Sequence, residues 1–314
     1  MQSSRKCALW GLAIVGLLAV AANGSALAAQ NAGDATRPSM PAANDPWPEV
    51  NLNVLVLDMQ DAPQAIDVSG FQLFEDNSER LLHFRATSDS PVSVAILIDT
   101  SGSMYKRREL NVAAVKAIAK ALPDGSEVMA VLFADSAFLD LPFTPVSRID
   151  YSFLNRVDAR GGTALYDAVV AAEKHFAARA RYARRAMVLF SDGLDNASTS
   201  RMEDAIRCLQ RPGAPMFYSF YIADPRASNA EMSHGTRAMV DLAKAGGGVA
   251  FTPSRAKDFE PALTRLTNMI RSQYVLRFTT ADPARDGKAH SLQVRLPVSG
   301  LRILALPAYY APGK

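Results

Sequence analysis

Cysteine and histidine are scarce in this sequence, which has only two cysteines and four histidines among 314 residues. Cys7 lies in an N-terminal apolar segment that we expect to be removed, so Cys208 alone would remain and no internal disulfide would form. We expect Cys208 to be a small buried hydrophobic residue. His175 and His234 lack the partner spacing of a zinc site. The sequence therefore argues against a disulfide scaffold and against zinc chemistry.

Long hydrophobic runs are also lacking, apart from a short one near the N-terminus. Arg5 and Lys6 precede the apolar residues 7–20, a run too short to span a bilayer comfortably, and small residues follow at 26–28. This order predicts a secretory signal peptide at residues 1–28, cleaved after Ala28; an uncleaved N-terminal anchor is the alternative. No later stretch approaches the roughly 20 apolar residues of a transmembrane helix. We therefore expect a periplasmic or secreted protein whose mature chain has no transmembrane segment.

The chain has no strong net charge of either sign. Its formal net charge of +3 includes Arg5 and Lys6, and without those two charges it becomes +1. Binding to nucleic acid needs clustered basic charge, so we expect no nucleic acid among the partners. Residues 179–185 do hold four arginines. Their position at the expected end of a helix favours an exposed, solvated face.

The two flanks of the sequence have a β-strand pattern. Residues 29–48 are rich in Ala, Pro, Asn and Asp, which is typical of a flexible linker. In the N-terminal flank, 49–90, we expect a strand at 50–58, a strand and tight turn at 71–80, and the returning strand at 82–85. In the C-terminal flank, 273–310, we expect strands at 274–279, 291–296 and 301–306. Because isolated hairpins are marginally stable in water, we predict that the flanks pair into one small β-domain.

The central part, residues 91–272, alternates strands with helices. The continuous apolar run 92–98 is typical of a strand that is buried on both faces. Further strands are expected at 128–133, 187–190, 216–222 and 249–251, with an extended edge segment at 137–143. Helices are expected from about Tyr105 to Leu122 and at 165–176, 202–209, 236–245 and 256–272. This alternation predicts an α/β fold, a doubly wound and mostly parallel sheet with helices on both faces.

Oxygen-bearing side chains follow the first of these strands. Asp99, Ser101 and Ser103 alternate at its expected carboxyl end. If the next turn folds back, one carboxylate and two hydroxyls converge, and such hard oxygen donors suit Mg²⁺, Mn²⁺ or Ca²⁺. Thr163 adds a hydroxyl from a glycine-rich loop that leads into a helix, and Asp192 follows the strand at 187–190. Ligands of doubly wound sheets bind beyond the carboxyl ends of strands, where the strand order reverses.

The order D-x-S-x-S…T…D, formed by Asp99, Ser101, Ser103, Thr163 and Asp192, resembles the metal-ion-dependent adhesion site of von Willebrand factor A domains. The similarity covers roughly residues 92–270. The phrases LIDTSGSM, GGTALYDAV, LFSDGLDN and SQYVLRF look like the bacterial secreted group of VWFA-related domain proteins.

The resemblance implies a Rossmann-like fold and a divalent cation, with Mg²⁺ expected first. It implies that Ser101 and Ser103 coordinate the ion directly, and Thr163 directly or through water. Asp99 and Asp192 would act mainly through bound waters. A protein partner would supply an Asp or Glu carboxylate as the last ligand. The chain would then be a binding module and not an enzyme.

Other interpretations of the same residues stay open. Asp99 at a strand end is also the place of the nucleophile in haloacid dehalogenase-like phosphotransferases, but that group needs a second acid where this chain has Ser101. A serine hydrolase would need a nucleophile elbow and a paired histidine. An envelope scaffold that uses the metal structurally, or not at all, is the third alternative.

Several neighbouring features have simpler explanations. Glycines 246–248 stand between a helix and a strand, which favours a helix C-cap and turn over a phosphate-binding loop. Asp195 and Asn196 lie close to the candidate site in the sequence. Asp167 is expected to orient the glycine-rich loop.

Overall fold

The computed structural model describes residues 47–86, 90–156 and 161–313. The predicted signal peptide lies outside these residues, and so does the predicted linker apart from Trp47 and Pro48. Within the described ranges, no helix combines the length and the apolar character that crossing a bilayer requires.

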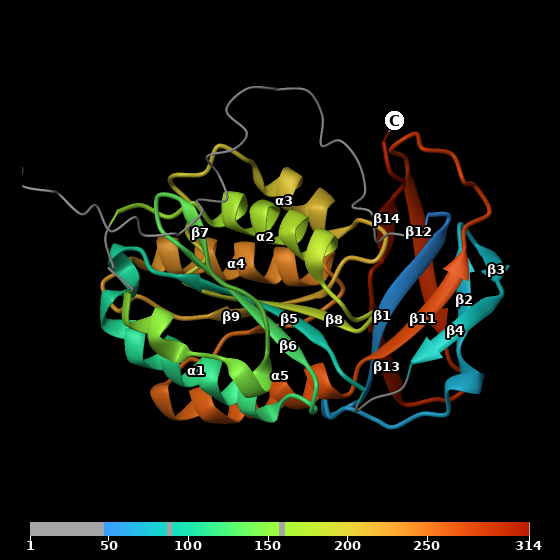
Figure 1. Ribbon diagram of the computed structural model, residues 1–314, viewed down its shortest axis with the longest axis horizontal. Coiled ribbons are helices and arrows are strands. Elements are labelled where there is room, and N and C mark those ends of the chain that lie inside the picture. The colour runs from blue at the N-terminus through green and yellow to red at the C-terminus, as the bar shows by residue number, and fades with distance from the viewer. Residues whose placement is uncertain (1–46, 87–89, 157–160, 314) are drawn as a thin grey trace, which may run out of the picture.

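A six-stranded sheet forms the larger unit of the fold (Figure 1). Its strands are β5 (Ser93–Asp99), β6 (Glu127–Phe133), β7 (Ala137–Pro145), β8 (Arg185–Ser191), β9 (Met216–Tyr221) and β10 (Ala250–Phe251). The strand order is β10-β9-β8-β5-β6-β7, and all neighbours are parallel except β7, which runs antiparallel to β6 at one edge. Every residue of β5, β6 and β9 is buried, as expected when helices cover both faces. The predicted doubly wound sheet is confirmed.

Helices lie on both faces of this sheet. They are α1 (Arg108–Ala121), α2 (Leu165–Arg179), α3 (Met202–Leu209), α4 (Asn229–Ala245) and α5 (Phe259–Arg271). Short 3-10 turns occupy Val68–Gly70, Gly102–Arg107, Val146–Arg148, Tyr151–Arg156 and Ala256–Asp258. Helices α1 and α5 pack on one face and α2, α3 and α4 on the other, with a separate hydrophobic cluster on each side (Figure 1).

Two helix starts differ from the prediction. Helix α1 begins at Arg108 and not near Tyr105, because the preceding residues Gly102–Arg107 form a 3-10 turn. Helix α4 begins at Asn229, well before the predicted Thr236. There the Ser228 and Glu231 side chains each accept a hydrogen bond from the other's backbone N–H, a capping box that starts the helix early.

The second unit is built from both flanks of the chain. Its strands are β1 (Glu49–Asp58), β2 (Gln72–Glu75), β3 (Ser78–Arg80), β4 (Leu82–Ala86), β11 (Tyr274–Thr279), β12 (Ala289–Arg295), β13 (Leu301–Ala305) and β14 (Ala308–Tyr310). They form two sheets in the orders β13-β1-β11-β4 and β14-β12-β2-β3. Strand β1 pairs with β11 and β13, and β2 pairs with β12, so the predicted association of the flanks is confirmed.

The prediction for the returning strand was wrong. The chain turns at Asp76 and Asn77, whose φ angles are +48° and +64°, and the strand that returns to β2 is β3. Strand β4 leaves that sheet and pairs with β11, where Leu82 lies opposite Phe278. Both side chains are buried in the core of the β unit, so burial of Leu82 stabilises this pairing. The larger unit is thus inserted between two neighbouring antiparallel strands, β4 and β11.

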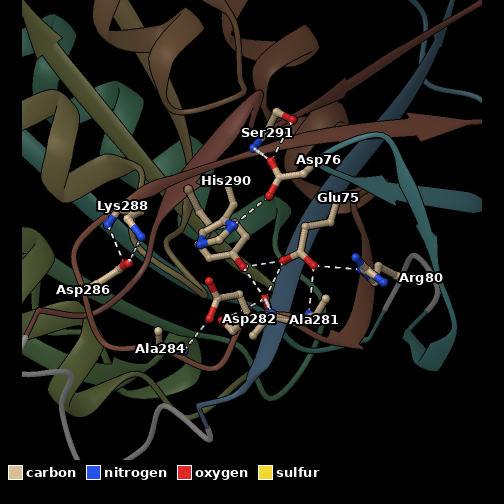
Figure 2. A network of polar contacts seen from close by, with 12 residues as sticks. Glu75, Asp76, Arg80, Ala281, Asp282, Ala284, Asp286, Lys288, His290 and Ser291 are labelled. Atoms are coloured by element: carbon tan, nitrogen blue, oxygen red, sulfur yellow. Dashed lines mark hydrogen bonds and ion pairs between the residues drawn. The ribbon is translucent and has the colours of Figure 1, made fainter.

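A buried carboxylate joins several elements of the β unit (Figure 2). Glu75, 1% exposed, accepts hydrogen bonds from the Tyr309 and Thr280 hydroxyls, from the Ala281 N–H and from the Arg80 guanidinium. Burial by itself raises the pKa of Glu75, but these four hydrogen bonds outweigh it and the pKa lies below its usual value. Glu75 therefore ties β2 to β3, to β14 and to the chain that leaves β11.

Buried polar contacts also join the two units. The Asn53 side chain accepts from the Arg185 N–H at 3.0 Å and donates to the Ala214 carbonyl at 3.4 Å. Arg184 is only 1% exposed and donates to the Ile270 carbonyl at 2.9 Å, at the C-terminus of α5. The predicted solvated face at 179–185 is therefore wrong for Arg184, because unpaired helix carbonyls accept its hydrogen bonds.

Of the three glycines after α4, Gly247 approaches the β unit, whereas Gly246 and Gly248 lie against Phe217 in β9. The Gly246 N–H donates to the Leu242 carbonyl, and Gly247 has a φ of +70°, so the predicted helix C-cap is confirmed. A Cβ on Gly247 would lie 2.5 Å from the Ala305 carbonyl carbon in β13. A Cβ on Gly248 would lie 2.1 Å from the Phe217 carbonyl oxygen. The close approach of the backbones explains why glycine is needed here.

Candidate metal centre

The candidate residues gather at the point where the strand order of the large sheet reverses. From β5 the chain continues to β6 on one side, whereas β8 lies on the other side, with Ile98 paired to Phe190. Asp99 ends β5 and Asp192 directly follows β8. Both acids therefore lie at the carboxyl edge of neighbouring parallel strands, as predicted.

Asp99 is fully buried and held by two hydroxyl-bearing residues. Its Oδ1 accepts the Ser101 N–H at 2.9 Å, and its Oδ2 accepts the Ser191 hydroxyl at 2.6 Å. Burial raises the pKa of Asp99 to about 7; hydrogen bonds from Ser101 and Ser191 act against this, and the nearby charge of Asp192 adds to it. The carboxylate is fixed in place in surroundings where added positive charge would stabilise it.

Ser101 and Ser103 bring their hydroxyls together. Ser101 is the N-cap of the 3-10 turn Gly102–Arg107, and its Oγ lies 3.1 Å from Ser103 Oγ. The Ser103 hydroxyl also lies close enough to the Asp192 carboxylate to lower its pKa. The turn thus places both hydroxyls between the two acids, as the alternate spacing predicts.

Asp192 has one oxygen without a partner. Its Oδ1 accepts the Leu194 N–H at 3.2 Å, whereas the buried Oδ2 has no hydrogen-bond partner among the described residues. Burial raises the pKa of Asp192, the nearby Ser103 hydroxyl and the Leu194 N–H lower it, and the charge of Asp224 raises it. A buried carboxylate oxygen without a partner is costly. A cation beside Oδ2 would remove that cost.

Thr163 is buried in the glycine-rich loop. Its N–H donates to Asn196 Oδ1 at 2.7 Å and its carbonyl accepts the Asn196 N–H at 3.0 Å. The loop meets the serine-bearing turn through a backbone hydrogen bond from Gly102 N–H to the Gly161 carbonyl, at 3.5 Å. Asp99 is bonded to the Ser101 N–H, the Ser101 and Ser103 hydroxyls contact each other, and Ser103 lies near the Asp192 carboxylate. Within the described part of the chain, the hydrogen bonds of Thr163 run through its backbone.

The glycine-rich loop is positioned by an acid that the sequence interpretation missed. Asp135 Oδ1 accepts the Gly162 N–H at 2.6 Å, and a Cβ on Gly161, whose φ is +84°, would lie 2.0 Å from Asp135 Oδ2. Asp167 has a different role from the expected one. It accepts the backbone N–H groups of Thr199 and Ser200, both at 2.8 Å, and so holds the segment beyond Asp192.

Asp224 and Arg226 form the rim of the site, and the sequence interpretation missed both. Asp224 follows β9, the strand next to β8, and its two carboxylate oxygens accept from the Nε–Nη2 edge of Arg226, Nε at 3.1 Å and Nη2 at 3.0 Å. The Arg226 hydrogen bonds, against a smaller effect of burial, hold the pKa of Asp224 below its usual value. The sequence held a signal for Asp224, because an acid that follows the next parallel strand lies at the same carboxyl edge of the sheet.

The chemistry of the donor set fits a hard divalent cation. No group of three or more His, Cys, Asp and Glu side chains that could hold a metal ion occurs in the described part of the chain. The candidate set has two carboxylates and three hydroxyls, so it differs in kind from such a group. Oxygen donors of this type suit Mg²⁺, Mn²⁺ or Ca²⁺. Such an ion would satisfy Asp192 Oδ2, for which the described ranges offer no hydrogen-bond partner.

Comparison with known proteins identifies this unit. Residues 94–194 match the family model of the von Willebrand factor type A (VWA) domain, and all five candidate residues fall inside the match. The chain contains a VWA domain. No curated protein sequence matches the chain.

Among solved structures, the chain is similar to a VWA protein from Catenulispora acidiphila, at 16% identity and a TM-score of 0.48, covering 86% of this chain and 74% of that one. It is similar to an aerotolerance-related membrane protein from Bacteroides fragilis at 20% identity and a TM-score of 0.44, covering 57% of this chain and 98% of that one. It is also similar to BatB from Bacteroides thetaiotaomicron, at 19% identity and a TM-score of 0.43, covering 58% of this chain and 100% of that one. The identification of the domain rests on the family model.

Proposed function

We propose that the VWA domain binds a protein partner through a divalent cation, and that an Asp or Glu carboxylate of the partner completes the coordination. The observation that carries the proposal is the buried Asp192 Oδ2, which has no hydrogen-bond partner among the described residues and lies in a side chain that Ser103 also contacts. Asp99, equally buried, supplies the second carboxylate. Two buried carboxylates beside three hydroxyls call for a double positive charge.

In the proposed site, Ser101, Ser103 and Thr163 hold the ion with neutral oxygens, and Asp99 and Asp192 act mainly through bound waters. Mg²⁺ is the ion we expect first, with Mn²⁺ or Ca²⁺ as alternatives. An ion held largely by neutral ligands keeps much of its attraction for a further anionic oxygen. That property makes it a receptor for a partner's carboxylate.

We propose binding and not turnover as the role of the site. Both Asp99 oxygens already accept hydrogen bonds and the side chain is fully buried, which disfavours attack on a phosphoryl group. Ser101 stands where a phosphotransferase of the haloacid dehalogenase-like group has its second acid. A Mg²⁺-dependent phosphatase activity that disappears in Asp99→Asn would contradict this part of the proposal.

The test is calorimetric titration of the chain with Mg²⁺ and Mn²⁺. We expect one site in the wild type, loss of binding in the double variant Ser101→Ala/Ser103→Ala, and wild-type binding in Ser69→Ala, an exposed serine in the β unit. Equal binding by the double variant, or no binding by the wild type, would favour the scaffold alternative. A pull-down from envelope extract, with and without EDTA, then tests whether a protein partner depends on the metal.

We also propose that the protein reaches the periplasm or the exterior by means of residues 1–28. The intact mass of the protein recovered from the periplasmic or secreted fraction would begin at Ala29 if cleavage follows Ala28. A mass that retains residues 1–28 would instead support the N-terminal anchor.

A further inference from the structure

One exposed cation borders the candidate metal centre. Arg226 donates from Nε and Nη2 to the two Asp224 oxygens, and Nη2 also contacts the Gly102 carbonyl at 3.4 Å. Gly102 stands between Ser101 and Ser103 in the chain, so the guanidinium lies against the turn that carries both candidate hydroxyl ligands. The pair Asp224–Arg226 is thus part of the rim of the same site.

The guanidinium is held in place but still has donors for another acceptor. The Arg226 side chain is 66% exposed, whereas that of Asp224 is 11% exposed. Asp224 occupies the Nε–Nη2 edge, and Nη1 makes no hydrogen bond to any residue of the described chain. Because the guanidinium is planar and its N–H directions are fixed, an orientation set by Asp224 also orients the Nη1 donors.

The charges around the site favour an acidic partner at this position. Asp99 and Asp192 form no ion pair within the described ranges, so a divalent cation would balance them. Asp224 is balanced by Arg226 and further influenced by the charge of Arg107. A first carboxylate on the metal therefore leaves the rim arginine available for a second one.

We propose that Arg226 is a second anchoring point, and that the partner presents two carboxylates, one for the metal and one for Nη1 of Arg226. This inference rests on the proposed function and narrows it to an acidic segment with two nearby Asp or Glu side chains. Exposed charge-assisted hydrogen bonds contribute modestly, so we expect the second carboxylate to tighten binding about threefold to tenfold. The gain should shrink at high salt.

The test uses Mn²⁺-loaded protein and short capped peptides, and measures the EDTA-sensitive relaxation of peptide protons by the bound Mn²⁺. One peptide series carries two aspartates separated by one to three glycines, and the matched series replaces the second aspartate by asparagine. We expect wild-type protein to prefer the two-aspartate series, and Arg226→Gln to lose that preference. The Mn²⁺ affinity is measured separately for every variant.

Two further variants separate the guanidinium from net charge and from folding. Asp224→Asn/Arg226→Gln keeps the net charge of the protein and should lose the preference as Arg226→Gln does. Arg181→Gln is the matched control, because Arg181 is 67% exposed and approaches Glu127 at the opposite, amino edge of the sheet. It should retain the preference.

The outcomes distinguish this inference from the proposed function. Equal binding of both peptide series to wild type, or a preference that persists in both Arg226 variants, refutes the role of Arg226 while metal-dependent carboxylate binding stands. If Mn²⁺ binds but neither series shows EDTA-sensitive relaxation, the proposed function is wrong and this inference fails with it.

Discussion

The sharpest prediction concerns a glycine that lies far from Asp192 in sequence and directly against it in space. Gly235 lies in α4, and a Cβ placed on it would be 2.0 Å from the Asp192 carbonyl oxygen and 3.2 Å from the carbonyl carbon. Gly193, with a φ of +75°, makes the reciprocal approach, because its Cβ would be 2.2 Å from the Gly235 carbonyl oxygen. The substitution Gly235→Ala therefore pushes on the backbone of a candidate ligand residue.

The magnitude follows from opposing effects. Alanine in a helix interior is favoured over glycine by about 1 kcal/mol. A close C–H···O contact needs about 3.3 Å between carbon and oxygen, so the Asp192 carbonyl oxygen must move away from the new Cβ by more than about 1 Å. Overpacking of this kind in a tight interior costs about 1–3 kcal/mol. On balance, we expect the Gly235→Ala protein to be less stable than wild type by up to about 2 kcal/mol. If Asp192 holds the ion, misplacing it should weaken Mg²⁺ binding about 10-fold to 100-fold, by analogy with changes to groups that orient metal ligands.

The assay is urea denaturation combined with calorimetric titration of Mg²⁺. Ser233→Ala is the matched control, since Ser233 is an exposed position of the same helix and tests helix propensity without the close contact. The control should be as stable as wild type or slightly more stable. A Gly235→Ala protein that gains stability as the control does would refute the packing argument. That stability result is informative even if the chain binds no metal.

Three further predictions concern buried groups. Ser191→Ala removes the hydroxyl that donates to Asp99 Oδ2 at 2.6 Å, and should cost about 1.5–3 kcal/mol of unfolding free energy in urea denaturation. The pKa of Glu75 is lower in the folded chain than its usual value of 4.5, so its contribution to stability is present above pH 4.5 and is lost as the pH falls through the depressed pKa. Glu75→Gln should therefore flatten the acid side of a stability–pH curve, and an unchanged slope would contradict this. Gly248→Ala should lower thermal stability, because its Cβ would lie 2.1 Å from the Phe217 carbonyl oxygen; an unchanged melting temperature would argue against the close approach.

Local sequence pattern predicted the strands and helices whose apolar residues follow one regular spacing. The run 92–98 is apolar throughout because β5 is covered on both faces, and α3 occupies exactly the predicted residues, Met202–Leu209. The pattern did not show where the chain changes sheets. Strands β3 and β4 are separated only by Leu81, and their different partners depend on strands far away in the sequence. Periodicity carries no information about such long-range pairing.

In the candidate site, too, the sequence predicted some of the residues and missed others. Asp99 and Asp192 could be placed together because the carboxyl ends of parallel strands share one edge. Ser191 and Asp135 were not predicted, and Asn196 was noted only for its closeness in the sequence, since each contacts a residue of a different strand or loop. Arg184 was misplaced for a related reason, because residue type alone predicts solvent exposure for arginine.

The insertion of the VWA domain between β4 and β11 has a consequence for the order of folding. These two strands pair residue by residue, with Ala86 opposite Val275, although the whole inserted domain separates them in the chain. β1 likewise pairs with β13, near the C-terminus. Closing such long loops in an unfolded chain is entropically costly, and a folded VWA domain would shorten the effective loop by holding its two ends near each other. The β unit therefore needs nearly the entire chain before its sheets can form, whereas the strands of the VWA domain are synthesised earlier and can begin to pair first.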